Sequence, residues 1–179
     1  MTDYILNLTY DIRQITQSLV FEFCQHDGSI SRPVEAGALA GSFNFQAGDT
    51  IKPQVTVLSA AHADKNNSLA NILDELTINE CMMLSIGARM VDALSMFDEA
   101  RASQTVAKWD EQVDVTTPED MGKNIKRLQQ AAQEPFKVVS KNGQWKVSGY
   151  LSVTMVNMAA ESLSRLYYFD PEGSTGPDF

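Results

Sequence analysis

Hydrophobic side chains recur at every second position over much of this 179-residue chain. Successive side chains of a β-strand point to opposite faces, so this spacing predicts strands with one buried face. No strand-helix-strand alternation accompanies it, which favours antiparallel sheets packed face to face. We therefore predict a mainly β protein, an antiparallel β-sandwich of about eight strands. The clearest predicted strands lie at residues 19–24, 39–45, 51–57, 76–86, 150–156 and 163–169.

One segment has a helical period instead. Thr117 can cap exposed backbone amides, and Pro118 suits the first helical position. Apolar residues then recur on one helical face down to Pro135. The sequence therefore predicts one inserted α-helix, at about 118–132. The apolar residues on its stripe are Met121, Ile125, Leu128 and Ala132.

Several local signals refine this outline. Residues 88–100 fit both helical and strand spacing, and their strand neighbours favour a strand. Pro53 lacks a backbone N–H, which predicts that strand 51–57 lies at a sheet edge or carries a bulge. Asn142-Gly143 favours a tight turn that joins 136–141 to 144–147 as a hairpin.

Residues 1–170 are expected to form a single β-sandwich domain, because one core usually serves a chain of this length. Residues 171–179 have the composition of a turn and are expected to form a flexible C-terminal tail.

Composition excludes some classes of partner. The chain has 14 Lys and Arg against 23 Asp and Glu, a net charge of −9. This excess of acids disfavours nucleic-acid binding. Apolar runs are too short for a membrane span, so no membrane association is expected. No signal peptide is visible, and the two cysteines, Cys24 and Cys81, are expected to be buried reduced thiols of a cytoplasmic protein.

Charge is segregated along the chain. Residues 92–120 contain eight acids and two bases, whereas residues 121–146 contain six bases and one acid. Two interpretations remain open. The blocks neutralise each other within the fold, or a basic face with Lys123, Lys126 and Arg127 docks an acidic partner.

Few residues suggest chemistry. Cys24 and His26 share a face of one predicted strand and could form a thiolate-base pair or two metal ligands. His62 and Asp64 form a second polar pair. No motif supplies a third partner for either pair, so we predict no catalytic residues, no metal site and no cofactor.

A sugar-binding platform is the other candidate site. Trp145 and Tyr150 could stack on a sugar ring if they lay side by side and exposed. Asp49 and Asp64, both in predicted loops, could then accept hydrogen bonds from sugar hydroxyls. Packing of these rings in the core or at a sheet edge is the alternative interpretation.

Two segments resemble a known family. Residues 41–51, Gly-Ser-Phe-Asn-Phe-Gln-Ala-Gly-Asp-Thr-Ile, resemble the strand and Gly-Asp-x-Ile element of the AidA/PixA-type inclusion body proteins. Residues 166–171, Leu-Tyr-Tyr-Phe-Asp-Pro, are similar to the aromatic C-terminal strand of that family. Lys52-Pro53 stands where members carry Arg or Trp, and 92–132 has no counterpart. The resemblance implies a compact cytoplasmic β-sandwich of bacterial origin without an established catalytic activity.

These observations favour a non-enzymatic protein that acts by self-association or binding. We expect a homo-oligomer, with a carbohydrate or another protein as further partners. Two alternatives remain, a carbohydrate-binding module that uses Trp145 and Tyr150, and a small enzyme that uses Cys24 with His26 or His62.

Overall fold

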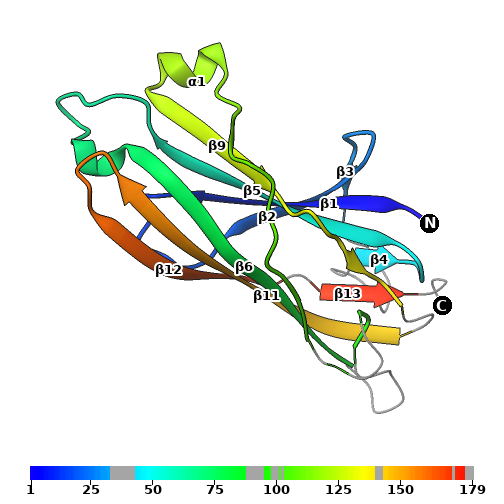
Figure 1. The fold of residues 1–179 in the computed structure, drawn as a ribbon. Coiled ribbons are helices and arrows are strands. Elements are labelled where there is room, and N and C mark those ends of the chain that lie inside the picture. The colour runs from blue at the N-terminus through cyan, green and yellow to red at the C-terminus, as the bar shows by residue number, and fades with distance from the viewer. Residues whose placement is uncertain are drawn as a thin grey trace.

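The computed structural model describes residues 1–32, 43–87, 95–97, 101, 103–139, 143–170 and 172–175. These residues fold as two β-sheets that enclose one hydrophobic core (Figure 1). The predicted mainly β class is confirmed. The described part of the chain forms thirteen strands, some of them very short, where about eight were predicted.

The first sheet has the strand order β3-β2-β1-β5-β9-β8, and β10 also pairs with β5. Its central pair, β1 and β5, is parallel, so the prediction of a purely antiparallel fold is wrong here. Parallel pairing is possible because the long connection between these strands passes through β4 in the other sheet. The strands of this sheet are β1 (Asp3–Asp11), β2 (Val20–Gln25), β3 (Ile30–Ser31), β5 (Thr50–Ala60), β8 (Val113–Asp114), β9 (Ile125–Ala131) and β10 (Phe136–Lys137).

The second sheet has the order β4-β13-β11-β6-β7, and β12 pairs with the later part of β11. β4 and β13 are parallel. The flexible tail expected at 171–179 contains β13, whose four residues lie between β11 and β4. A short 3-10 helix, η1 (Leu69–Asn71), precedes β6. The strands are β4 (Phe43–Phe45), β6 (Leu73–Gly87), β7 (Ser103–Val106), β11 (Gly143–Asn157), β12 (Ser162–Phe169) and β13 (Glu172–Thr175).

The core lies between the two sheets. Along β1 every second side chain, from Tyr4 to Tyr10, is buried, as the alternation predicts. Aromatic rings join the sheets, with ring centroids 4.5 Å apart for Tyr10 and Tyr167 and 4.6 Å apart for Phe23 and Phe43. Burial of each large apolar side chain contributes ~1.5–3 kcal/mol, so this shared core holds the two sheets together.

The predicted helix at 118–132 is only partly present. α1 (Pro118–Gly122) begins with the predicted cap, in which the Thr117 side chain accepts from the Asp120 N–H. The chain then turns at Asn124, which has a φ of 56°, and residues 125–131 form β9 instead. β9 pairs with the open edge of β5 over seven residue pairs, and this pairing outweighs the helical spacing.

The predicted hairpin around Asn142-Gly143 is wrong. Phe136 and Lys137, in its first arm, pair with β5 of the first sheet, whereas its second arm is β11 of the second sheet. Val138 extends the first contact, because its N–H donates to the Asp49 carbonyl over 2.9 Å. This segment therefore connects the two sheets.

Pro53 does not lie at an edge, because β5 has β1 on one side and β9 and β10 on the other. On that second side the pairing passes from β10 at Ile51 to β9 at Gln54. Pro53 stands in this interval, where its missing N–H is tolerated, and its carbonyl accepts from the Ala132 N–H. This interval is a change of partner strand, and the pairings of β5 show no register shift that would mark the predicted bulge. The predicted edge position is wrong.

The predicted strand at 88–100 lies mostly outside the described residues. Residues 95–97 are described, and they form a bend in place of a strand. Met96 is buried there, and its N–H donates to the Ser85 hydroxyl over 3.0 Å.

Candidate functional site

The outer face of the second sheet carries apolar side chains at its centre. On β11 the inward positions from Trp145 to Met155 are buried, so the alternate positions face away from the core. Tyr150 lies in the middle of this outward row and is partly exposed. Its cross-strand neighbours are Tyr168 on β12 and Met82 on β6.

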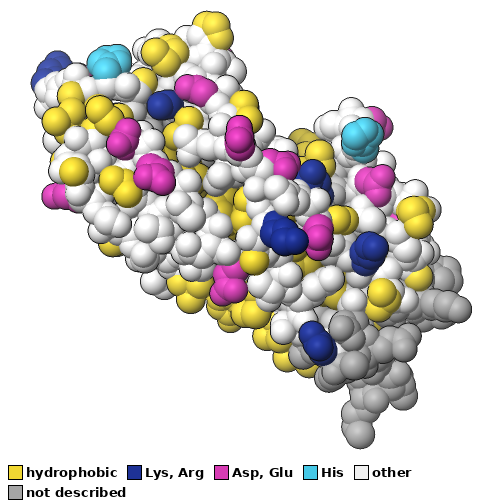
Figure 2. Space-filling view, viewed as in Figure 1, with side chains coloured by type: hydrophobic (Ala, Val, Ile, Leu, Met, Phe, Trp, Pro, Cys, Tyr) yellow, Lys and Arg dark blue, Asp and Glu magenta, His cyan; other side chains and the backbone are white. Residues whose placement is uncertain are grey.

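Further apolar residues surround this row. Leu166 lies opposite Ser152, and Leu84 lies opposite Ser148. Exposure is 48% for Tyr168, 52% for Leu166 and 51% for Ile86. Hydrophobic side chains are visible in Figure 2 along the border that β6 and β11 form in Figure 1. We call the following six residues the apolar face: Met82, Leu84, Ile86, Tyr150, Leu166 and Tyr168.

Polar groups border the apolar face. On one side the Asn79 amide donates to the hydroxyls of Ser152 and Thr154, over 3.3 and 3.2 Å. On the other side the Ser148 hydroxyl donates to Asp170 over 3.0 Å. These polar groups already have hydrogen-bond partners. Burial of the apolar centre away from water therefore gives the most favourable free energy change of any part of this surface.

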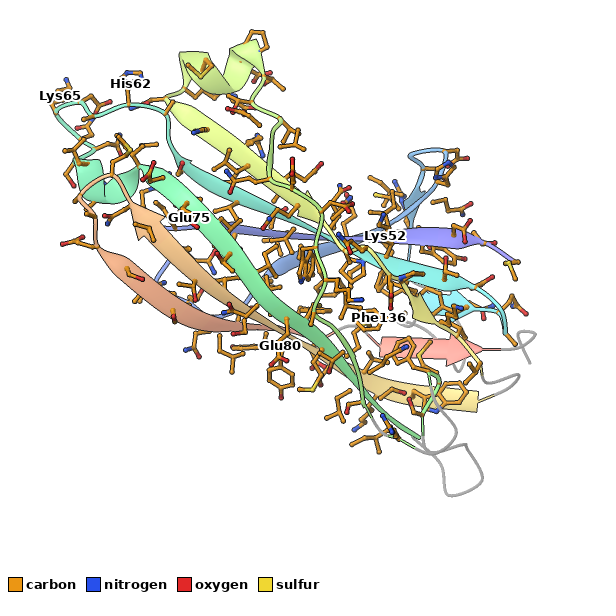
Figure 3. The ribbon with its side chains drawn as sticks, viewed as in Figure 1. Lys52, His62, Lys65, Glu75, Glu80 and Phe136 are labelled. Atoms are coloured by element: carbon orange, nitrogen blue, oxygen red, sulfur yellow. The ribbon has the colours of Figure 1, made fainter. Side chains whose placement is uncertain are left out.

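Two charges of opposite sign stand at opposite ends of the apolar face. Glu80 lies beside Ser152, and Lys146 lies beside Ile86. Both are exposed. Figure 3 labels Glu80 below β6, on the side away from the first sheet. Asp170 borders the Lys146 end as well, and Glu172 on β13 pairs with Lys146 in the strand register, so the border carries three acids and one base.

The predicted sugar platform is not assembled as the sequence suggested. Trp145 is 2% exposed and faces the core, whereas Tyr150, five positions later, faces outward. An odd spacing along a strand places two side chains on opposite faces. Tyr150 is therefore kept as a candidate binding residue, and the exposed platform with Trp145 is wrong.

The two acids of that prediction serve local structure. Asp49 is buried and accepts backbone N–H bonds from Thr2 at 2.6 Å and Gln46 at 2.7 Å. Asp64 is exposed and accepts from the backbone N–H groups of Asn66 and Asn67, whose hydrogen bonds help to lower its pKa. Asp49 and Asp64 flank opposite ends of β5, whose eleven residues at ~3.3 Å each separate them by ~36 Å.

The cysteine-histidine hypothesis gains no support. Burial and the nearby Glu22 carboxylate raise the pKa of Cys24, so its reactive thiolate form is disfavoured. Its sulfur accepts from the Asn7 amide over 3.3 Å. His62 is exposed and lies in the loop that follows the last residue of β5. Its backbone N–H donates to the Asn124 side chain there. Among the described residues no group of three or more His, Cys, Asp or Glu could hold a metal ion.

The charge blocks meet within the fold, as the first interpretation predicted. Lys123 pairs with Glu119, and Arg127 pairs with Asp120 over 2.9 Å. The hydrogen bond from the Thr117 hydroxyl, followed by weaker contributions that include Arg127, lowers the pKa of Asp120 to about 2. These contacts fix α1 against β9. Two of the three bases of the predicted docking face are therefore already paired.

The sequence analysis did not select Tyr168, Leu166 or Met82 as site residues. A signal for them was present, because Leu166 to Phe169 and Cys81 to Leu84 are uninterrupted apolar runs within strands. Such a run makes both faces of a strand apolar, although only one face can pack on the core of a two-layer sandwich. The other face must then be exposed or covered by a partner.

Comparison with known proteins supplied no relative. No protein-family model matches the chain, and no curated protein matches it at a significant level. Within the described residues, no helix has the length and apolar character needed to cross a bilayer. The similarity to AidA/PixA-type inclusion body proteins therefore stays a prediction.

Proposed function

We propose that this protein is a non-enzymatic β-sandwich protein that acts by self-association through its apolar face. The carrying observation is the cluster of six neighbouring apolar side chains on the outer face of the second sheet, three of them about half exposed. Contiguous exposed apolar surface of this kind marks interaction sites on soluble proteins. Its central pair of tyrosines is also of a residue type enriched at interfaces.

A second copy of the chain is the occupant that the charges favour. A two-fold interface needs a surface that complements itself. Lys146 lies three residues before Gly149 on β11, and the row of Ser152 and Glu80 lies three residues after it. A two-fold axis across the strands at Gly149 would bring Lys146 of one copy near Glu80 of the other. A different protein would need its own acid and base at the positions that complement Lys146 and Glu80.

Charge reversal tests this pairing. Glu80→Lys and Lys146→Glu each place like charges together, and we expect each to weaken dimerisation about fivefold, as measured by sedimentation equilibrium. The double variant, Glu80→Lys with Lys146→Glu, restores opposite charges and should regain most of the wild-type affinity. Lys65→Glu, in a distant exposed loop, serves as the control for net charge.

Two results would overturn the proposal. One is a wild-type protein that stays monomeric up to millimolar concentration. The other is a double variant that is weaker than both single variants, because that outcome requires Glu80 and Lys146 to meet different groups.

Carbohydrate binding is the second candidate function. Tyr150 and Tyr168 are neighbours on an open sheet face, bordered by the hydroxyls of Ser148 and Ser152. Adjacent partly exposed rings of this kind can stack on sugars. A glycan array with the wild type and Tyr168→Ala separates the two functions. Glycan binding that is lost in the variant, by a protein that stays monomeric, would favour the carbohydrate-binding module.

We further propose a cytoplasmic location. Cys24 and Cys81 are both free thiols, which suits a reducing compartment. Thiol counting on protein taken directly from cells would check this, with two reactive sulfurs expected after denaturation.

A further inference from the structure

A trough crosses the outer face of the first sheet, on the side of the molecule opposite the apolar face. Its cavity volume is about 330 Å³. The floor is formed by β1 and β5, with Ile5 near its centre. His26, at the end of β2, lines one side, and Ala131 and Pro135 line the other. Figure 2 shows the surface hollowed beside the β2–β3 hairpin, and Figure 3 labels Lys52 below it.

Strand register fixes the order of the side chains. The β1–β2 ladder ends at Tyr4 and Gln25, and the next residue of each strand, Asp3 and His26, lines the trough. On its other side Asp3 pairs with Thr50, and Ile5 pairs with Lys52. The acid and the base thus stand at diagonal positions, with the apolar Ile5 beside both.

The two charges of the trough remain available to a ligand. Asp3 accepts one hydrogen bond, from the neutral Thr50 hydroxyl over 2.6 Å, which uses only its Oδ1 atom. Lys52 is 42% exposed, and Asp110 lies 4.0 Å from its Nζ atom, at a separation that salt and water screen well. A ligand carboxylate could approach Lys52 and His26, while a ligand ammonium could approach Asp3.

We infer that this trough binds a small zwitterion with an apolar side chain, of the free α-amino acid class. Its volume is at the lower end of the range for small-molecule sites, which is ~300–1,000 Å³. The ligand carboxylate pairs with Lys52, its ammonium pairs with Asp3, and its side chain covers Ile5 and Pro135. The trough and the apolar face belong to different sheets, so this inference is independent of the proposed self-association.

Titration calorimetry and NMR shift mapping with three probes test the inference. The probes are L-leucine, L-leucinamide, which lacks the carboxylate, and N-acetyl-L-leucine, which lacks the ammonium. We expect leucine to bind and each of the other two to bind about tenfold more weakly, because each loses one charged contact. Lys52→Gln should reduce leucine affinity about tenfold and abolish the preference for leucine over leucinamide.

Asp3→Asn should abolish the preference for leucine over N-acetyl-leucine, again with about a tenfold loss of leucine affinity. Lys65→Gln removes the same charge as Lys52→Gln, but in the loop beyond the far end of β5, and should bind leucine as the wild type does. The inference is overturned if leucine does not bind at millimolar concentration. It is also overturned if the three probes bind equally, or if Lys52→Gln and Lys65→Gln behave alike in a protein whose circular dichroism is unchanged.

Discussion

The outer faces of the two sheets differ in how they meet water. On the first sheet, polar side chains form hydrogen bonds from strand to strand. The Gln54 amide donates to Asn7 over 3.0 Å, and Asn7 donates to Cys24. On the second sheet, Tyr168, Tyr150 and Met82 occupy the corresponding central row across three strands. Hydrogen bonds bridge the centre of the first face, and its exposed apolar side chains, Val20, Ile30 and Val113, lie toward its edges, whereas the centre of the second face itself leaves apolar surface exposed.

This difference distinguishes the residues that stabilise the fold from those that are available to bind a partner. The inner faces of both sheets carry the same alternating apolar pattern and share one core. Stability therefore explains the inward positions of β11, but it does not explain why outward positions such as Tyr150 are apolar. The proposed self-association would explain them. The trough on the first face, in contrast, is a local interruption of a polar surface, and suits a small ligand better than a protein.

The largest effect is expected from a charge at the centre of the apolar face. Tyr150→Glu should weaken self-association about 100-fold, which is ~2.7 kcal/mol, because the interface would bury a carboxylate close to its own copy from the other subunit. Thr9→Glu, on the outer face of the first sheet, should leave it unchanged. Analytical ultracentrifugation of both variants measures the effect. Equal dimerisation of both would remove the distinction between the two faces.

Acid should act on the corner where α1 meets the first sheet. Asp120 has a folded pKa of about 2, below its ordinary value of 3.8, so its ionised form favours the folded state. The contribution of the Asp120 carboxylate to the free energy of unfolding is complete above about pH 4 and is lost as the pH falls toward 2. Asp120→Asn should therefore be less stable than wild type at pH 7 and equal to it near pH 2, by urea unfolding. A difference that is constant with pH would contradict this.

Loss of the strand-to-strand hydrogen bonds on the first face should lower the free energy of unfolding by a smaller amount. Asn7→Ala breaks hydrogen bonds to Gln54 and Cys24 and should lower the free energy of unfolding by ~1 kcal/mol. Ser152→Ala, on the second face, should cost less than this, because that hydroxyl is bonded only at 3.3 Å. Chemical denaturation of the two variants compares the faces. A larger loss for Ser152→Ala would reverse the comparison.

The smallest expected effect is on the reaction rates of the two cysteine thiols. Burial raises the pKa of Cys24, and it raises that of Cys81, which is fully buried, much further. Cys24 should therefore react with a disulfide reagent at pH 7 several-fold more slowly than an exposed thiol, and Cys81 should react only on unfolding. Rapid reaction of Cys24 in the folded protein would revive the enzyme hypothesis.

Part of the fold could be predicted from local pattern. Alternation placed β2, β5, β6, β11 and β12, because the requirement to bury one face acts at every second residue. The cap at Thr117 was likewise readable, because capping involves only neighbouring residues. The length of the following helix was not, because β9 exists only through its pairing with β5, more than sixty residues earlier.

Parts of the candidate site also escaped prediction. Trp145 and Tyr150 looked alike as aromatic residues, and their odd spacing already implied opposite faces of one strand. Which of the two faces is exposed depends on the position of the other sheet. Tyr168 became the neighbour of Tyr150 only when β12 aligned with β11.

The sequence by itself determined the period of the strands and hence a mainly β fold with a buried inner face. Only the tertiary structure decided which strands are neighbours, that β1 and β5 run parallel, and that 136–138 joins the first sheet. The physical reason is that hydrophobic alternation is a local property of the chain, whereas sheet order depends on hydrogen bonds between distant segments. Both proposed sites are assembled across strands, and so they belong to this second kind of information.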